Sequence, residues 1–151
     1  MKKKKVKIEN RSARRDYKLF DKYEAGIVLQ GSEVKSVKLG QVDLKGSYCK
    51  FINSELYVIG LHIAHYEKSR KDLPTRRPRK LLLHKHELKR LHGLLSERGF
   101  TLVPLSIYIN ERGFVKLEIA LARGRKKHEK KEYLKQREIE REMEYMMRRR
   151  R

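Results

Sequence analysis

The stretch "TLVPLSIYINERGFVKLEIALA", from Thr101 to Ala122, decides the fold. It contains two β-rich runs around the turn-forming "NERG". In the second run apolar residues alternate with Lys116 and Glu118, which predicts a strand with one buried and one solvated face. Pro104 lies in the middle of the first run and cannot donate a ladder hydrogen bond, so we expect it at an edge or a bulge. An antiparallel pair of strands is therefore expected here.

Preceding segments add strands and a helix. "YEAGIVLQG" (Tyr23–Gly31) predicts a strand that ends in a turn. "SEVKSVKLG" predicts a short helix with Ser32 as its cap and Gly40 as its stop in the left-handed conformation. "GSYCKFINSELYVIGLHI" holds two β-rich runs around Asn53 and Ser54, which predicts a hairpin.

A second helix is expected in "RRPRKLLLHKHELKRLHGLLSERG". The segment begins extended because of Pro78 and then takes helical spacing, with Gly99 as the stop. The leucines at its helical spacing are Leu88, Leu91, Leu94 and Leu95.

Composition divides the 151 residues into three zones. Residues 1–15 are expected to form a basic N-terminal arm, residues 16–122 a folded body, and residues 123–151 a basic C-terminal tail. Short antiparallel strands interrupted by two helices predict a mainly β fold: a closed barrel of the oligonucleotide-binding (OB) type with Greek-key connections and flanking helices. Closure would remove the exposed strand edges.

The charge points to a polyanionic partner. Forty Lys and Arg against 19 Asp and Glu leave a net charge of +21. Like charges on a compact body repel one another, whereas a cation placed on a nucleic-acid phosphate releases condensed counterions. A heat-adapted surface usually gains Glu together with Lys, which does not fit the deficit of acids. Nucleic acid is the favoured partner.

No apolar run approaches the roughly 20 residues of a membrane-spanning helix, so membrane binding is the weaker alternative. The start "MKKKKVKIENR" resembles neither a signal peptide nor an anchor. We expect a cytoplasmic protein that is monomeric when free. Cys49 is expected to be a small buried hydrophobic residue without a disulfide partner.

The six histidines do not make a convincing metal or catalytic site. His62 and His65 are three residues apart and His84 and His86 two apart, but zinc needs about four well-placed ligands. The chain has no Gly-rich phosphate loop, nucleophile elbow or catalytic carboxylate pair. We therefore expect no metal, no cofactor and no enzymatic activity.

Two basic motifs are candidates for RNA contact. "NRSARRDY" combines Asn10 with Arg11, Arg14 and Arg15, whose guanidinium groups can bind phosphate or stack on bases. "TRRPRKLLLHKH" sets arginines beside three leucines, of which most should be core and one could lie against a nucleotide. On general grounds Glu24 would sit in a structural ion pair, although a carboxylate can also accept hydrogen bonds from base amino groups.

The tail, "GRKKHEKKEYLKQREIEREMEYMMRRRR", favours helix but has few apolar residues. Pairs such as Glu138 with Arg141 stabilise a helix by only about 0.2–0.5 kcal/mol each. Its apolar stripe begins late and is too short for a coiled coil. Helices without tertiary packing are marginal in water, so we expect the free tail to be disordered or frayed and to become helical on an anionic partner.

Several motifs together resemble the small protein B family, the SsrA-binding proteins of bacterial trans-translation. The resemblance runs in order from Asn10 to Arg137 and is carried by these stretches: "NRSARRDY", "EAGIVLQGSEVKS", "RPRKLLLHKHEL", "GFTLVPLSIY" and "ARGRKKHEKKEYLKQRE". "EAGIVLQGSEVKS" and "RPRKLLL" are the most specific of them.

The resemblance implies an OB-type barrel that binds the tRNA-like domain of transfer-messenger RNA (tmRNA) and supports its alanylation and its delivery to stalled ribosomes. It implies contact with elongation factor Tu and alanyl-tRNA synthetase only through the RNA. The tail would enter the empty mRNA channel and fold there, near the decoding centre, which permits rescue and tagging of the nascent chain.

The resemblance also assigns residues. It gives RNA-binding roles to Asn10, Glu24 and Leu82, which overturns the structural interpretation of Glu24. The remaining RNA contacts we expect are the cations Arg11, Arg14, Arg15, Lys35, Arg77, Arg79 and Lys80. In the tail we expect a hinge at Gly124, stacking by His128, and ribosome contacts by Lys126, Lys127, Glu129, Lys130 and Lys131. The family usually has Asp-Lys-Arg where this chain has Glu129, Lys130 and Lys131.

Replacing Glu24 or Asn10 by Ala should then weaken RNA binding and leave the fold intact. Two alternatives remain open. A general single-strand RNA-binding protein would bind any RNA of equal length similarly, because phosphate contacts do not distinguish sequences. A small histidine nuclease would lose RNA cleavage on His84→Ala or His62→Ala.

Overall fold

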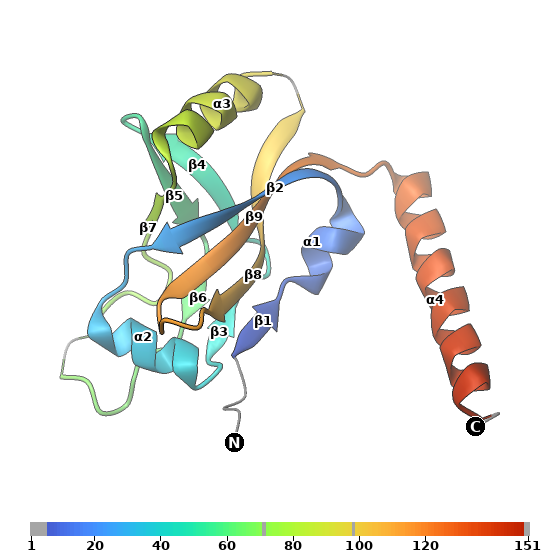
Figure 1. Ribbon diagram of the computed structural model, residues 1–151, viewed down its shortest axis with the longest axis horizontal. Coiled ribbons are helices and arrows are strands. Elements are labelled where there is room, and N and C mark those ends of the chain that lie inside the picture. The colour runs from blue at the N-terminus through green and yellow to red at the C-terminus, as the bar shows by residue number, and fades with distance from the viewer. Residues whose placement is uncertain (1–5, 71, 98, 150–151) are drawn as a thin grey trace.

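The computed structural model describes residues 6–149 except 71 and 98 (Figure 1). The predictions for residues 1–5 of the arm and for the last two arginines lie outside the described residues. No described helix is long and apolar enough to cross a membrane.

The described part of the chain forms nine strands and four helices. The strands are β1 (Lys7–Glu9), β2 (Tyr17–Ile27), β3 (Val42–Asp43), β4 (Tyr48–Ile52), β5 (Glu55–Ile59), β6 (His62–Ile63), β7 (Arg79–Leu82), β8 (Phe100–Ile109) and β9 (Val115–Gly124). The helices are α1 (Arg11–Asp16), α2 (Gly31–Lys38), α3 (Lys85–Leu95) and α4 (Lys127–Arg149).

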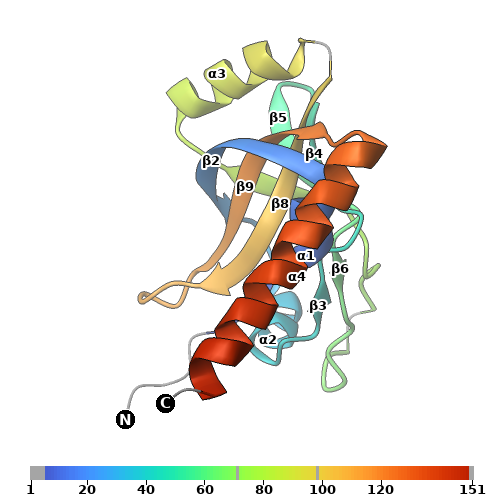
Figure 2. The ribbon, with the colours of Figure 1, turned by 90° about the vertical axis from the view of Figure 1, so that its right-hand side faces the viewer.

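Seven strands form one antiparallel sheet in the order β1-β8-β4-β5-β7-β2-β9. β9 also pairs with β8. The series of paired strands that starts at β8 and runs through β4, β5, β7, β2 and β9 therefore leads back to β8. β3 and β6 make a separate two-stranded sheet. Helices α3 and α2 lie at opposite ends of the body, and α4 extends beside α1 (Figures 1 and 2). The prediction of a mainly β fold with flanking helices is confirmed.

The main core lies on the inner face of the sheet. Leu56, Leu81, Leu102 and Leu117 are among its fully buried side chains. Cys49 is buried there as predicted, and burial raises the pKa of its thiol. A smaller cluster lies on the outer face of β8 and β9, where Ala13 of α1 packs on residues that include Val103, Leu105, Ala120 and Ala122.

Three local predictions are confirmed. Asn53 and Ser54 have φ of +50° and +67° and form the two-residue turn between β4 and β5. Both central residues have positive φ, as in the turn type that matches strand twist. Gly40, with φ of +74°, follows the C-cap of α2. The β8–β9 register shifts between Pro104 and Ser106, so Pro104 lies at an irregularity of the ladder.

Two helix boundaries were predicted wrongly. α2 begins at Gly31 with Gln30 as its N-cap, so Ser32 lies inside the first turn. The carboxylate of Glu33 takes over the capping, because it accepts the Gln30 backbone N–H at 2.9 Å. α3 ends at Leu95, and Gly99, with φ of +85°, turns the chain further on, just before β8.

The predicted basic arm also differs from the structure within its described part. Residues 7–9 pair with β8, and residues 11–16 form α1. The cause is apolar: Ile8 packs against the main core, and Ala13 is buried against the outer face of the sheet. The folded body therefore begins before residue 16.

Candidate nucleic-acid interface

An exposed stretch of the outer sheet surface lies beside α1. The register aligns Leu82 on β7 with Gly26 on β2, Gly26 with Lys116 on β9, and Lys116 with Tyr108 on β8. The row faces outward because the neighbouring Ala25 and Leu117 are buried in the core. We call this surface the sheet platform; it comprises Gly26, Leu82, Tyr108 and Lys116 with Glu24 and Glu118 in the next row.

Two carboxylates face each other on the platform. Glu24 and Glu118 are direct cross-strand partners, a like-charge pairing that is unfavourable by itself. The Tyr108 hydroxyl donates a hydrogen bond to Oε2 of Glu24. Partial burial, this hydrogen bond and the charges of Glu24 and Glu118 all raise the pKa of Tyr108, so it remains a neutral donor. Glu24 is thus exposed yet held in place.

Leu82 is the exposed leucine of "KLLL". Its side chain is 53% exposed, whereas Leu81 is 1% exposed in the core. Strand alternation places the two on opposite faces, so Leu82 borders the platform. Lys80 lies two residues earlier on β7, half-exposed, with Nζ 3.2 Å from Oε1 of Glu55. These positions suit contact with a partner, and the RNA contact itself stays a prediction.

Helix α1 presents its arginines next to the platform. Ala13 anchors the helix, so Arg11 and Arg15 are exposed and Arg14 is half-buried. Arg15 Nε lies 3.0 Å from Oδ1 of Asp16. The hydrogen bond from Arg15 lowers the pKa of Asp16, with help from the charges of Arg15 and Lys130. The arrangement of the three arginines allows them to bind phosphate.

Asn10 lies inside the fold, and its predicted RNA contact stays a prediction. Its residue is 4% exposed, and its amide nitrogen donates to the carbonyls of Leu44 and Pro104 at 3.3 and 2.9 Å. Its side-chain oxygen accepts from Ser12 and from the Ala13 backbone N–H. Through these bonds the Asn10 side chain holds the start of α1 in place.

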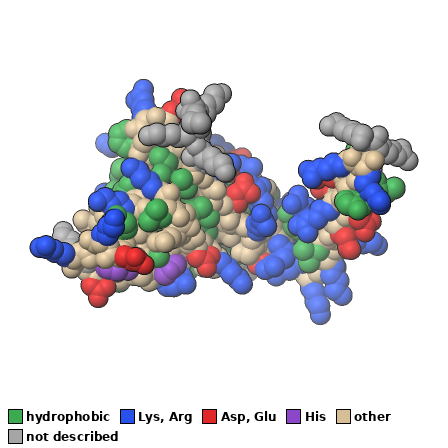
Figure 3. Space-filling model, turned by 90° about the horizontal axis from the view of Figure 1, so that it is seen from below, with side chains coloured by type: hydrophobic (Ala, Val, Ile, Leu, Met, Phe, Trp, Pro, Cys, Tyr) green, Lys and Arg blue, Asp and Glu red, His purple; other side chains and the backbone are tan. Residues whose placement is uncertain are grey.

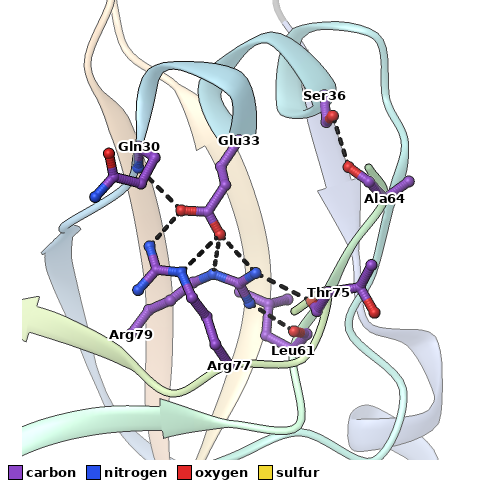
Figure 4. A network of polar contacts seen from close by, with 8 residues as sticks. All are labelled: Gln30, Glu33, Ser36, Leu61, Ala64, Thr75, Arg77 and Arg79. Carbon is purple, nitrogen blue, oxygen red and sulfur yellow. Dashed lines mark hydrogen bonds and ion pairs between the residues drawn. The ribbon is translucent and has the colours of Figure 1, made fainter. Parts of the chain in front are cut away.

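Arg79 is likewise structural. Its side chain is fully buried, and it donates to Glu33 at 2.7 Å and to the Leu61 and Thr75 carbonyls at 2.7 and 3.0 Å (Figure 4). Arg77 also binds Glu33 through both Nε and Nη2. These hydrogen bonds turn both guanidinium groups toward Glu33, and the RNA contacts of Arg77 and Arg79 stay predictions.

The carboxylate of Glu33 carries the negative charge that pairs with both arginines. Burial alone would raise the pKa of its carboxyl, but hydrogen bonds from Arg77, the Gln30 backbone and Arg79 outweigh burial and lower the pKa. The network ties α2 to β7 and to the segment before it. Lys35, on the same helix, is exposed with Nζ 5.3 Å from the ring of Tyr66 and remains a candidate for RNA contact.

Comparison with known proteins assigns the chain to a family. The family model described as SmpB protein matches residues 7–149. The chain belongs to the SmpB family. It is 52% identical over 138 residues to the SsrA-binding protein of Thermus thermophilus, covering 91% of this chain and 96% of that protein. The SsrA-binding protein of Coprothermobacter proteolyticus is 46% identical over 141 residues, covering 92% and 94%.

A solved structure agrees with this SmpB-family assignment. The structure named "tmRNA-SmpB: a journey to the center of the bacterial ribosome" contains a chain that is 54% identical to this one. The match has a TM-score of 0.69 and covers 81% of this chain and 86% of that chain.

The tail of this SmpB-family chain forms a helix with a fixed root. Gly124 ends β9 opposite Tyr17, and an added Cβ there would meet nothing within 4 Å. The Arg125 backbone N–H donates to the Asp16 carbonyl at 2.8 Å, and Lys130 Nζ lies 3.7 Å from Oδ1 of Asp16. The Arg125 guanidinium also lies 4.7 Å from the centre of the Tyr133 ring. These contacts join the first turns of α4 to the body.

Beyond its root, α4 buries none of its described residues. A helix over 127–149 differs from the predicted disorder of the free tail. Local contacts favour the helix, such as Arg137 with Glu140 at 3.9 Å and Arg149 over the ring of Tyr145. The residues expected to contact the ribosome, apart from the half-buried Glu129 and Lys130, are exposed: Gly124, Lys126, Lys127, His128 and Lys131.

Basic side chains cover much of the surface. Seen from below, Lys and Arg are spread over the body and along α4, with acids between them (Figure 3). Among the described residues, no three of His, Cys, Asp or Glu are grouped so that they could hold a metal ion.

Sequence reasoning missed Tyr108 on the sheet platform and the exposed Phe114 in the turn between β8 and β9. The alternation that placed Lys116 and Glu118 on a solvated face carried part of the signal, since Tyr108 is the partner of Lys116. The bond from Tyr108 to Glu24 joins residues 84 positions apart and could not be found from local spacing.

Proposed function

We propose that this chain is a tmRNA-binding adaptor of trans-translation. It binds the tRNA-like domain of tmRNA and accompanies it to stalled ribosomes. The observation that carries the proposal is the family match over residues 7–149, which spans both the sheet platform and the tail. The exposed Glu24, fixed by Tyr108, supplies a base-reading acceptor, and the arginines of α1 supply phosphate contacts.

The body and the tail of the chain have different tasks in this function. The body holds the RNA through Arg11, Arg14 and Arg15 with Glu24, Lys35, Lys80 and Leu82, while the tail from residue 123 reads an unoccupied mRNA channel. In the channel, Gly124 gives freedom at the root, and His128 and the cations up to Lys131 contact ribosomal RNA. An anionic channel would stabilise α4, because it neutralises cations that repel one another along the helix.

The adaptor acts without catalysis and without a cofactor. It supports alanylation of tmRNA and meets alanyl-tRNA synthetase and elongation factor Tu through the RNA. Its place of action is the cytoplasm, where stalled ribosomes are, and it is a monomer when free. We infer that the body is a closed OB-type barrel with Greek-key connections; the return of the pairings to β8 supports this.

Competition binding tests the function. The full chain is bound to a labelled tRNA-like domain at fixed salt, and an unrelated hairpin of equal length is added as competitor. An adaptor specific for tmRNA requires a large excess of hairpin for displacement. Equal competition by both RNAs would instead indicate a general RNA-binding protein, because phosphate contacts alone do not distinguish them.

A further inference from the structure

An apolar pocket lies at one end of the sheet platform, and no function has yet been given to it. The pocket has a volume of about 300 Å³ and lies between β2, β7 and the turn from β8 to β9. Leu82, Val34 and Phe114 line it together with Gly26, Gly113 and Lys116. Its position extends the row that links Leu82, Gly26 and Lys116.

The wall made by Phe114 is exposed, and hydrogen bonds hold the backbone that carries it. The residue is 62% exposed, and its ring borders the pocket. The side-chain oxygen of Asn110 accepts the Phe114 backbone N–H at 2.9 Å, and the Phe114 carbonyl accepts the Asn110 N–H at 2.9 Å. Gly113, with φ of +84°, supplies the left-handed residue that this turn requires. The ring is therefore presented to solvent by an ordered loop.

The floor of the pocket is open because residue 26 is glycine. A Cβ there would lie 3.4 Å from the Leu82 Cβ, in van der Waals contact, and would take up part of the pocket floor. The backbone conformation of Gly26 lies outside the left-handed region, so space rather than backbone freedom distinguishes glycine at this position. Lys116, beside the glycine, adds a cation at the rim.

We propose that this pocket binds one unstacked nucleobase of the RNA, which stacks on Phe114 and rests against Leu82, with its phosphate on Lys116. The inference rests on the proposed function. An apolar peptide side chain could fill such a pocket, but Lys116 at its rim and the net charge of +21 on the whole chain favour a polyanion. Single-stranded loops of RNA present unstacked bases that bind aromatic side chains in this way.

The test compares variants of the full chain in binding to the tRNA-like domain of a tmRNA across a range of salt. Loss of one base stack costs about 1–3 kcal/mol, so Phe114→Ala should weaken binding by about 5- to 150-fold. The salt dependence should not change, because Phe carries no charge. Phe114→Tyr keeps a ring and should retain affinity. Tyr145→Ala is the matched control, since Tyr145 is 61% exposed but lies on α4.

A second measurement reports the base directly. Unpaired positions of the RNA are replaced one at a time by 2-aminopurine, and one position should change fluorescence with the wild type and with Phe114→Tyr but not with Phe114→Ala. If Phe114→Ala binds with wild-type affinity while Glu24→Gln weakens binding, the proposal that the pocket binds a base is wrong. The proposed function would still hold in that case. A wild-type chain that does not prefer the tRNA-like domain would overturn the proposed function itself.

Discussion

Glu24 shows how one residue can be exposed and still be precisely oriented. A carboxylate on a surface strand normally samples several rotamers, and this freedom is lost on binding. Here Tyr108 holds one oxygen, and the cross-strand Glu118 disfavours a position closer to β9. The orientation is therefore established in the free protein, and it would lower the entropic cost of the RNA contact that we propose for Glu24.

This arrangement predicts the effect of two substitutions. Glu24→Gln should weaken binding of the tRNA-like domain by about 5- to 150-fold, because a base-reading pair contributes about 1–3 kcal/mol. Tyr108→Phe should weaken it less, about tenfold, since the carboxylate remains but is no longer held. Titrations at several salt concentrations should give an unchanged slope for both variants. Glu118→Gln keeps the bond between Tyr108 and Glu24 and should retain affinity; equal losses in all three variants would contradict the assignment.

Helix α2 depends on an acid that the sequence did not mark as important. Glu33 caps the helix and neutralises Arg79 in the interior. Breaking such a buried pair by removing one partner costs about 3–5 kcal/mol. We therefore expect Glu33→Gln to lower the free energy of unfolding in urea by that amount at pH 7, with Glu24→Gln as the exposed control that leaves stability within about 0.5 kcal/mol.

The same acid gives a pH dependence. The pKa of Glu33 is lower in the folded state, so the folded state binds fewer protons than the unfolded chain. The stabilisation is fully present above the unfolded pKa of about 4.3 and is lost as pH falls through the folded value. Urea unfolding measured from pH 6 down to pH 3 should show a smaller loss of stability for Glu33→Gln than for the wild type. Parallel curves for the two proteins would contradict this role.

Helix α1 depends on Asn10 in a similar way. Asn10→Ala removes the N-cap and the buried hydrogen bonds that the Asn10 amide donates to the carbonyls of Leu44 and Pro104, so it should destabilise the protein by about 2 kcal/mol or more. This replaces the earlier expectation that the fold would stay intact. Thermal unfolding checks it, and Ser12→Ala, which loses only a part-buried hydroxyl, is the control. RNA affinity should fall only as far as α1 is disordered.

Some of these elements could be predicted from sequence patterns, but the burial of individual residues could not. Alternation around Lys116 and Glu118 predicted β9, and Asn53 with Ser54 predicted the hairpin, because both signals are local. Burial of Arg79 and Asn10 was not predictable, since their partners Glu33 and Pro104 lie 46 and 94 positions away. A basic motif looks the same whether its cations face RNA or the core. The family resemblance identified Glu24 and Leu82, while their setting on the platform came only from strand register.

At the scale of the whole molecule, charge is shared unequally between body and tail. From residue 124 onward there are twelve Lys and Arg and six Glu, so the tail carries +6 and the remainder +15 of the net +21. The body therefore keeps most of the electrostatic attraction for RNA. The tail has the higher density of charge of both signs, and none of the described residues of α4 is buried.

This division predicts that truncation after Arg123 separates two activities. The shortened chain loses Arg125 and Lys130, whose contacts with Asp16 are few and partly exposed, so the body should remain folded. Affinity for the tRNA-like domain should fall less than tenfold at physiological salt, because the platform and α1 are retained. Tagging of stalled nascent chains in a reconstituted translation system should be abolished, because nothing then enters the mRNA channel. Tagging by the truncated chain at wild-type yield would refute the role of the tail, and loss of RNA binding would show that α4 belongs to the RNA-binding surface.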